Sequence, residues 1–252
     1  AKLQKELPGE VYITRTLATY SYELNNKKAP FDNVNIRKAL NLSLDRNVIT
    51  DKVLGQGQTP TYVFTPTYIE EGHLIQQPAY SKEPMAQRNA EAIKLLEEAG
   101  YSKANPLKFT ILYNTNENHK KVAIAAASMW KANTKGLIDV KLENQEWKTY
   151  IDSRRAGRYD AARAGWNADY NQATTFGNYF LSNSSNNTAK YANPEYDKAI
   201  AESYVATDAE GRAKAYAKAE EILAKDFGIV PIFNYVNPRL VKPYVKGYSG
   251  KD

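Results

Sequence analysis

Residues 159–170 read YDAARAGWNADY, and this stretch decides how the rest of the chain is interpreted. The segment Tyr159–Gly165 predicts a strand, and the polar loop Trp166–Gln172 follows it. In α/β sheets, ligands bind where strands end and loops begin. The loop after Gly165 is therefore the first place where we expect a binding site.

The same stretch places several kinds of binding group within a few residues of one another. Asp169 could neutralise an ammonium group, Arg163 could form a forked pair with a carboxylate, and Trp166 could cover apolar surface. Gly165 exposes its backbone groups. Together these groups could bind a zwitterion such as a peptide, which carries both an ammonium and a carboxylate. An internal Arg163–Asp169 ion pair that closes the loop explains the same spacing equally well, and the residues alone leave both interpretations open.

Predicted strands and helices alternate along the whole chain. Val11–Leu24 alternates in polarity and is rich in β-forming residues, so it predicts a strand. Apolar residues then recur at helical spacing from Val34 to Val53, which predicts one helix capped by Asp32 or Asn33. Further helices are predicted at Gln87–Ala99, Lys120–Lys131, Trp147–Ala156, Pro194–Ser203 and Ala209–Lys225, and further strands at Leu107–Tyr113, from Val140 and at Gly228–Tyr235. This alternation predicts an α/β fold in which helices cover a mixed sheet.

The composition excludes several classes of protein. The 252 residues are 42% hydrophobic and 25% charged, which is typical of a globular chain and not of a disordered one. There is no cysteine, so disulfides, cysteine-ligated zinc and thiol nucleophiles are excluded. The two histidines, His73 and His119, lie in different segments, so no metal site is expected. No apolar run approaches the ~18 residues of a membrane span.

The net charge of +6 does not indicate a nucleic-acid partner. The basic residues are spread along the chain, whereas a surface that follows phosphates should be clustered. Tyrosine is abundant, at 19 residues, and suits either a surface that grips varied partners or the edges of strands. Cofactors are not expected from any motif in the chain.

Two short motifs resemble enzyme signatures only weakly. Gly55-x-Gly57 lacks the third glycine of a dinucleotide-binding loop and follows a predicted helix, so it is interpreted as a turn. Ser128 and Lys131 form an S-x-x-K tetrapeptide like that of penicillin-recognising enzymes, but no K-[TS]-G element follows. An acyl enzyme centred on Ser128 therefore remains only a distant alternative.

A set of landmarks in order along the chain resembles the family-5 solute-binding proteins of ABC importers. The landmarks are Ala29-Pro30-Phe31-Asp32, Arg37-Lys38-Ala39-Leu40, Asp45-Arg46, Leu95 to Tyr101, Gly157-Arg158-Tyr159-Asp160, Gly165 to Tyr170, Tyr191, Tyr196-Asp197 and Ile229-Val230-Pro231-Ile232. The resemblance covers essentially the whole chain, but members of that family are about twice as long. It therefore implies one lobe, the C-terminal half, of a type II periplasmic-binding-protein-like clamshell.

The resemblance also implies a division of the chain. Residues 18–235 would form the peptide-binding lobe. Residues 1–17 would be the hinge connection, and residues 236–252 would return toward the missing N-terminal lobe. The implied function is capture of short peptides in the bacterial periplasm and their delivery to an ABC permease, without any bond being made or broken. Murein peptides or haem on the same scaffold remain alternatives, and nickel is hard to reconcile with two histidines and no cysteine.

Carried over by position, the resemblance assigns roles to single residues. Asp169 would pair with the α-ammonium of a peptide, and Gly165 and Asn167 would offer backbone groups to its main chain as an added strand does. Arg163 and His119 would receive the peptide carboxylate, although a solvated loop histidine is nearly as good an interpretation of His119. The side-chain pockets would be lined by Trp147, Trp166, Arg154 and Tyr235.

The chain departs from the resembled family at three positions. Ala18 and Asn167 stand where the relatives carry paired cysteines, so no disulfide is expected. Leu54 stands where they carry a lysine that serves longer peptides, which leaves the preferred peptide length open.

Overall fold

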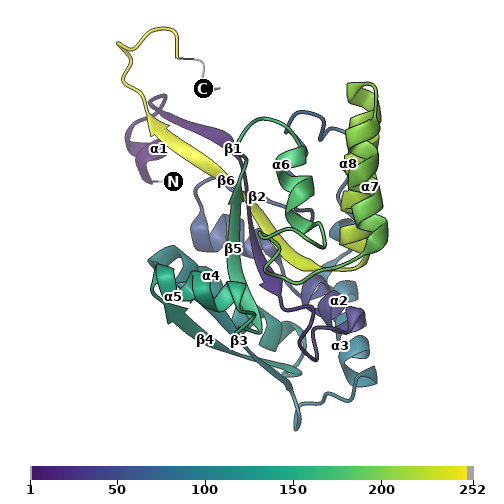
Figure 1. Ribbon diagram of the computed structural model, residues 1–252. Coiled ribbons are helices and arrows are strands. Elements are labelled where there is room, and N and C mark those ends of the chain that lie inside the picture. The colour runs from purple at the N-terminus through teal and green to yellow at the C-terminus, as the bar shows by residue number, and fades with distance from the viewer. Residues whose placement is uncertain (1, 249–252) are drawn as a thin grey trace.

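A six-stranded mixed sheet forms the centre of the computed structural model, which describes residues 2–248. The strand order is β2-β6-β1-β5-β3-β4 (Figure 1). The central strand β1 pairs antiparallel with β5 and β6, whereas β3 pairs in parallel with β4 and β5. The strands are β1 (Val11–Leu24), β2 (Thr59–Pro60), β3 (Leu107–Asn114), β4 (Ile138–Gln145), β5 (Ala161–Asn167) and β6 (Ile229–Leu240). The predicted α/β fold with a mixed sheet is confirmed.

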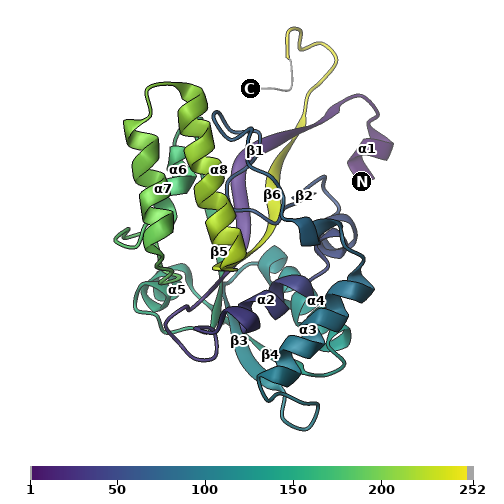
Figure 2. The same ribbon diagram turned by 90° about the vertical axis from the view of Figure 1, so that its right-hand side faces the viewer.

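Helices cover both faces of this sheet (Figures 1 and 2). They are α1 (Lys2–Glu6), α2 (Val34–Leu42), α3 (Met85–Glu98), α4 (Glu117–Asn133), α5 (Trp147–Arg155), α6 (Thr174–Gly177), α7 (Pro194–Val205) and α8 (Ala209–Lys225), together with the π-helix η1 (Val48–Leu54) and the 3₁₀-helices η2 (Ala79–Lys82) and η3 (Asn178–Phe180). Strand alternation separates two cores, because neighbouring residues of a strand point to opposite faces. Tyr20 and Tyr22 of β1 pack with α2, α3 and α4, whereas a second core gathers around α6, α7 and α8.

Buried hydrogen bonds tie the first core together. The indole of Trp130 on α4 is fully buried and donates from Nε1 to the carbonyl of Leu40 on α2 at 2.9 Å. A buried indole N–H needs such a partner, because leaving it unpaired would cost free energy. The contact fixes α4 against α2 on the face of the sheet that carries Tyr20 and Tyr22.

The single helix predicted from Val34 to Val53 is wrong, because two shorter elements, α2 and η1, occupy that range. The interruption has a physical cause. The fully buried guanidinium of Arg46 donates to the carbonyls of Asn41 and Leu44 at 3.1 and 3.3 Å. These acceptors would serve the helix itself if it continued. Two buried arginines take them instead, since Arg88 on α3 also donates to the Leu44 carbonyl, at 3.0 Å.

The outer halves of β1 and β6 run side by side as a two-stranded arm (Figure 1). Val11 pairs with Leu240 and Arg15 with Val236, and the ladder between β1 and β6 is then interrupted between Arg15 and Thr19. The predicted boundaries at residues 17/18 and 235/236 fall beside this interruption. Within the predicted connecting segments, residue 1 and residues 249–252 lie outside the described residues.

Candidate functional site

Among the described residues, a strand lies on only one side of the final residues of β5. On that side, β1 pairs with β5 as far as Ala18 opposite Asn167. On the other side, β3 pairs with β5 only at Ala161 and Ala162. The far side of residues 163–167 is therefore not covered by a strand, and we call it the open edge (Figure 1).

Hydrogen bonds show which backbone groups face the open edge. The hydroxyl of Tyr150 on α5 donates to the carbonyl of Arg163, so that carbonyl points away from β1. Backbone groups of a strand change side at every residue, so those of Gly165 and Asn167 also point away from β1. The N–H of Ala168 points the opposite way and donates to the Leu17 carbonyl at 2.8 Å, as the same alternation requires.

Two hollows flank the open edge. One, of about 420 Å³, is called the Tyr235 hollow and is lined by Thr16, Trp147, Arg163, Gly165, Asn167, Tyr235, Val236 and Asn237. The other, of about 400 Å³, is called the Arg154 hollow and is lined by Trp147, Ile151, Arg154, Arg155, Gly165, Trp166, Tyr179, Ser185, Asn186 and Thr188. Trp147 and Gly165 border both hollows, and the Trp147 residue is 59% exposed. The structure thus brings together seven of the predicted site residues around one strand end.

Arg163 brings a positive charge to the Tyr235 hollow. Its Nη2 donates to the hydroxyl of Tyr235 at 2.6 Å, its Nη1 donates to Asn114 Oδ1 at 3.3 Å, and its guanidinium lies 5.1 Å from the ring centroid of Tyr20. Within residues 2–248 it makes no ion pair, and its buried Nε has no hydrogen-bond partner. An anionic group in the hollow would supply the missing counter-charge.

Gly165 makes room for this guanidinium. A Cβ at residue 165 would lie 2.6 Å from Arg163 Nη2 and 3.3 Å from the Tyr235 hydroxyl. Any side chain there would push the guanidinium away from its hydrogen bond with Tyr235. Glycine thus allows the observed hydrogen bond between Arg163 and Tyr235, in addition to leaving the backbone of the open edge accessible.

Asp169 stands in the loop that follows β5. The residue is exposed, and its backbone N–H donates to Thr175 Oγ1 at 3.3 Å. Its carboxylate forms no ion pair in the described part of the chain. The alternative of an internal Arg163–Asp169 pair is therefore wrong, because Arg163 is held by Tyr235 and Asn114 instead. Both charges remain available to a ligand.

His119 lies beside Arg163 and is neutral at neutral pH. Its Nδ1 is hydrogen-bonded to the Tyr20 hydroxyl at 3.1 Å. Burial, together with the positive charge of Arg163, lowers the pKa of His119 to about 4. In the predicted role of carboxylate receptor, His119 would therefore contribute a hydrogen bond and not a charge.

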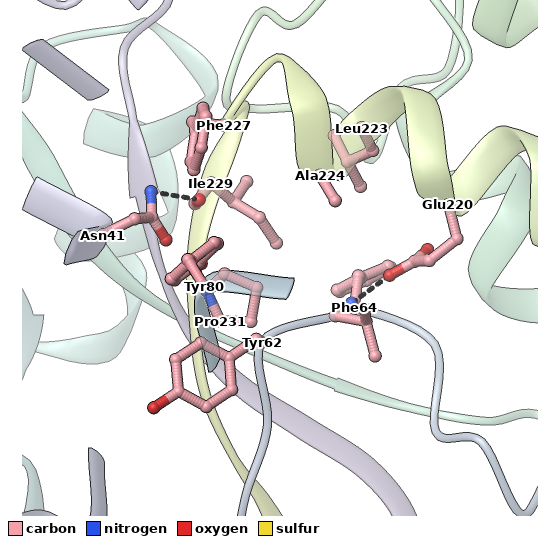
Figure 3. Close-up of a pocket in the computed structure, with 11 residues that line it drawn as sticks. Asn41, Tyr62, Phe64, Tyr80, Glu220, Leu223, Ala224, Phe227, Ile229 and Pro231 are labelled. Carbon is pink, nitrogen blue, oxygen red and sulfur yellow. Dashed lines mark hydrogen bonds between the residues drawn. The ribbon is translucent and has the colours of Figure 1, made fainter. Parts of the chain in front are cut away.

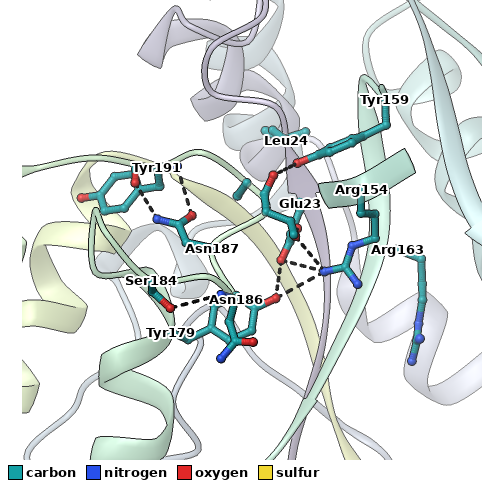
Figure 4. Close-up of polar contacts among 12 residues, drawn as sticks. Glu23, Leu24, Arg154, Tyr159, Arg163, Tyr179, Ser184, Asn186, Asn187 and Tyr191 are labelled. Atoms are coloured by element: carbon teal, nitrogen blue, oxygen red, sulfur yellow. Dashed lines mark hydrogen bonds and ion pairs between the residues drawn. The ribbon is translucent and has the colours of Figure 1, made fainter. Parts of the chain in front are cut away.

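Arg154 lines its hollow, but its charge is already neutralised (Figure 4). Its Nη2 lies 3.1 Å from Glu23 Oε1, and Tyr179 and Thr188 donate to the two oxygens of Glu23 at 2.6 and 2.5 Å. Burial alone would lower the pKa of Arg154, but the Glu23 carboxylate raises it. We call Glu23, Arg154, Tyr179 and Thr188 the charge network. Arg154 therefore forms part of the wall of the hollow, while its charge is already paired with Glu23.

Sequence reasoning missed Glu23, although one signal was present. Glu23 lies in the inner half of β1, where every residue from Ala18 to Leu24 is buried. A carboxylate in a fully buried stretch needs a cation or several donors, because an isolated buried charge is costly. That requirement could have directed attention to a buried arginine, although nothing in the sequence says which one.

The remaining motifs and cavities lie elsewhere. Ser128 and Lys131 are exposed on α4 and line neither hollow. A small cavity of about 10 Å³ lies between α8 and the segment at Tyr62–Phe64, where the buried carboxylate of Glu220 accepts from the Phe64 N–H (Figure 3). Within the described residues, there is no cluster of three metal-ligating side chains and no helix long and apolar enough to cross a membrane.

Comparison with known proteins agrees with this geometry. The family model for the middle part of bacterial extracellular solute-binding proteins, family 5, matches residues 1–188. The chain belongs to this family. The family resemblance inferred from the sequence landmarks is confirmed.

Similar proteins share both sequence and fold with the chain. It is 96% identical over 252 residues to the periplasmic oligopeptide-binding protein OppA of Haemophilus influenzae, covering 100% of this chain and 47% of that protein. It is 45% identical over 247 residues to the periplasmic murein peptide-binding protein MppA of Escherichia coli, covering 98% and 45%. A crystal structure of Haemophilus influenzae OppA in complex with RPPGFSPFR superposes with a TM-score of 0.94 at 95% identity, covering 100% and 49%. The chain spans about half the length of these relatives.

Proposed function

We propose that this family-5 chain forms half of a periplasmic receptor that binds short peptides and delivers them to an ABC permease. The observation that carries the proposal is the open edge of β5, where neither Arg163 beside it nor Asp169 after it has an ion-pair partner within residues 2–248. The names of the similar oligopeptide-binding and murein peptide-binding proteins support the same class of ligand.

In the proposed mode of binding, the peptide adds a strand to the open edge. Gly165 and Asn167 would exchange main-chain hydrogen bonds with it, which holds the peptide without reading its side chains. Asp169 would pair with the α-ammonium and fix the N-terminus. Arg163 would receive the peptide carboxylate, and His119 would add a hydrogen bond to the same carboxylate. Residues 163 and 167 are about 13 Å apart along an extended strand, a distance suited to a few peptide residues.

The two hollows would accept peptide side chains. Trp147 borders both hollows, so it would stand between neighbouring side chains of the peptide. Tyr235 lines one hollow, whereas Trp166 and Arg154 line the other. Volumes of about 420 and 400 Å³ leave room for trapped water beside a peptide side chain. Such water can fill the space that a smaller side chain leaves, so each hollow would accept side chains of different size.

We also propose the division of the chain into a lobe at 18–235 and connections at 1–17 and 236–252. The two-stranded arm and the interrupted ladder between Arg15 and Thr19 support it. A second lobe would close over the peptide by hinge motion and remove the Asp169 pair from water. This closure would matter, because an exposed pair contributes only ~0–1 kcal/mol.

The proposed role makes and breaks no bond, so the chain would not act as an enzyme. An acyl enzyme at Ser128 has little support, because that residue is exposed and lines neither hollow. Fluorescent penicillin should therefore leave the chain unlabelled. Haem and murein peptides remain alternatives on the same scaffold, and the binding experiment below should include haem and a murein tripeptide as competitors.

The test of the proposal uses a hybrid receptor, in which this chain replaces the matching half of Haemophilus influenzae OppA. Calorimetry would measure the affinity of tri-alanine for the hybrid and for its Asp169→Asn variant. We expect the substitution to weaken binding about 30-fold or more, because one partner of a buried charge pair is lost. N-acetylated tri-alanine should bind both proteins equally weakly. Unchanged affinity for tri-alanine in Asp169→Asn would refute the ammonium assignment.

Nuclear magnetic resonance of the 252-residue chain alone would locate the contacts. Amide shifts confined to residues 163–170, and seen with tri-alanine but not with its acetylated form, are the expected result. Shifts centred on another surface would contradict the proposed edge.

A further inference from the structure

The loop at residues 168–173 carries Asp169 but has little contact with the sheet. Its backbone reaches β1 at one point, the bond from the Ala168 N–H to the Leu17 carbonyl. On its far side it is bound to a second loop. The Ala173 N–H donates to the Glu70 carbonyl at 3.0 Å, and the Glu70 N–H donates to Asn171 Oδ1 at 3.0 Å. The position of Asp169 thus depends on its own bond to Thr175 of α6 and on the segment around residue 70.

One buried side chain connects this second loop to both of its neighbours. The Glu71 side chain is only 6% exposed, and its two oxygens have different partners. Oε1 accepts from Arg212 on α8, with both Nε and Nη2 at 2.8 Å. Oε2 accepts from Gln172 Nε2 at 3.1 Å. The carboxylate therefore bridges helix α8 and the loop that carries Asp169.

The backbone and the charge at Glu71 are both unusual. Its φ of +65° lies in the left-handed region, which residues other than glycine seldom occupy. Burial would raise the pKa of Glu71, but the hydrogen bonds from Arg212 and Gln172 outweigh it and lower the pKa. An uncommon backbone conformation persists only where surrounding contacts determine it, and such residues concentrate at functional sites.

We propose that Glu71, held by Arg212 on α8, is a positioning residue for the ammonium-binding carboxylate of Asp169. This inference rests on the proposed function. Glu71 does not touch the ligand; it acts through Gln172, which stands three residues after Asp169 in the same loop. The rigid α8 helix then sets where the loop stands. Holding the carboxylate in place before the peptide arrives avoids the loss of loop freedom on binding.

Two variants of the hybrid receptor test this role. Glu71→Gln removes the charge that orients Arg212, and Gln172→Ala cuts the link while leaving the Glu71–Arg212 pair intact. We expect each to weaken tri-alanine binding about tenfold and to leave the weak binding of N-acetyl-tri-alanine unchanged. The matched control is Glu202→Gln, which breaks an exposed 3.5 Å pair with Lys218 of α8 away from the loop and should bind like the unmodified hybrid.

A double-mutant cycle separates positioning from general damage. In the Asp169→Asn background, Glu71→Gln should cost no further affinity, because there is no carboxylate left to position. The inference is overturned if Gln172→Ala binds tri-alanine normally. It is also overturned if Glu71→Gln lowers the affinity for tri-alanine by the same factor in the Asp169→Asn background as in the unmodified hybrid. If Asp169→Asn itself binds normally, the proposed function fails instead. The two failures are therefore distinguishable.

Discussion

Two charged regions of the molecule differ in how their charges are neutralised. In the charge network, Glu23 is buried and has an arginine, a tyrosine and a threonine as partners (Figure 4). At the open edge, Arg163 is hydrogen-bonded only to neutral groups, and the Asp169 carboxylate has no ion-pair partner within residues 2–248. The charges of the first region are paired with each other, and those of the second have no ion-pair partner among the described residues.

This difference suggests how to separate structural charges from binding charges. Removing one member of a buried ion pair leaves the other charge buried and unpaired, which destabilises the fold. A charge held in position by neutral groups costs stability unless a ligand supplies the opposite sign. Changes in the charge network should therefore alter the free energy of unfolding, and changes at the open edge should alter affinity.

The largest effect is expected for Glu23→Ala. Removal of the carboxylate leaves Arg154 buried without a counter-charge, and the free energy of unfolding should fall by about 3–5 kcal/mol. Urea denaturation of the chain, followed by circular dichroism, measures this. Asp169→Ala, as the matched change of an unpaired carboxylate, should shift stability by less than about 0.5 kcal/mol. If both variants lost the same free energy of unfolding, the proposed distinction between structural and binding charges would be wrong.

Glu220 extends the comparison, because it is buried and forms no ion pair within residues 2–248; Figure 3 shows its hydrogen bond with Phe64. Burial raises its pKa to about 7, although the amides of Phe64 and Thr65 donate to it and oppose that change. The folded protein thus holds a proton that the unfolded chain releases. The resulting stability is complete below pH 4.5 and is lost as the pH rises through 7, by roughly 3 kcal/mol in total.

Glu220→Gln should remove this pH dependence and keep the shape of the side chain. Urea midpoints of the variant and the unmodified chain, measured from pH 4.5 to pH 8, should diverge as the pH rises, with the variant becoming the more stable. Parallel profiles would show that Glu220 titrates normally.

Arg163→Met tests the open edge from its positive side. In the hybrid receptor, tri-alanine or tetra-alanine should bind about tenfold or more weakly, since a charge-assisted hydrogen bond contributes about 1.5–3 kcal/mol. The C-terminal amides of the same peptides lack the negative charge and should be affected less. If acid and amide lose affinity equally at both lengths, Arg163 does not receive the carboxylate.

The smallest effect is expected for His119. Its pKa of about 4 lies below the ordinary value of 6.5, so its neutral form stabilises the fold above pH 6.5 and the benefit is lost as the pH falls through 4. Partial exposure reduces the change to about 1 kcal/mol. Titration of the imidazole signals by nuclear magnetic resonance would give the pKa directly. Arg163→Met should raise the pKa of His119, because it removes a nearby positive charge. An unaltered pKa would mean that burial alone lowers it.

The sequence predicts regular elements well where a local signal defines them. The helix at Ala209–Lys225 has the predicted bounds, because Asp208 caps it by accepting from the Gly211 N–H at 2.7 Å. The helix predicted through residue 53 fails, because Arg46 within the segment and Arg88 from α3 take its carbonyls. The competition from Arg88 leaves no pattern in the helical segment itself.

The same contrast holds for the site. The nine binding residues came from local landmarks and from family resemblance, and seven of them line the two hollows. The charge network could not be foreseen, since Thr188 lies 165 residues from Glu23 along the chain. The open edge depends on where β3 stops pairing with β5, which is a property of the whole sheet.

The open edge also bears on the solution behaviour of the molecule. Unpaired strand edges are templates for pairing between chains, so the groups offered to a peptide are equally offered to another copy of the protein. Here the exposed ladder is only five residues long and ends in the polar pair Asn167 and Asp169. A short edge with a charge at its end resists extension into aggregates. Bound peptide would act as a protective cap against self-association, so the ligand-free protein should be the more aggregation-prone state.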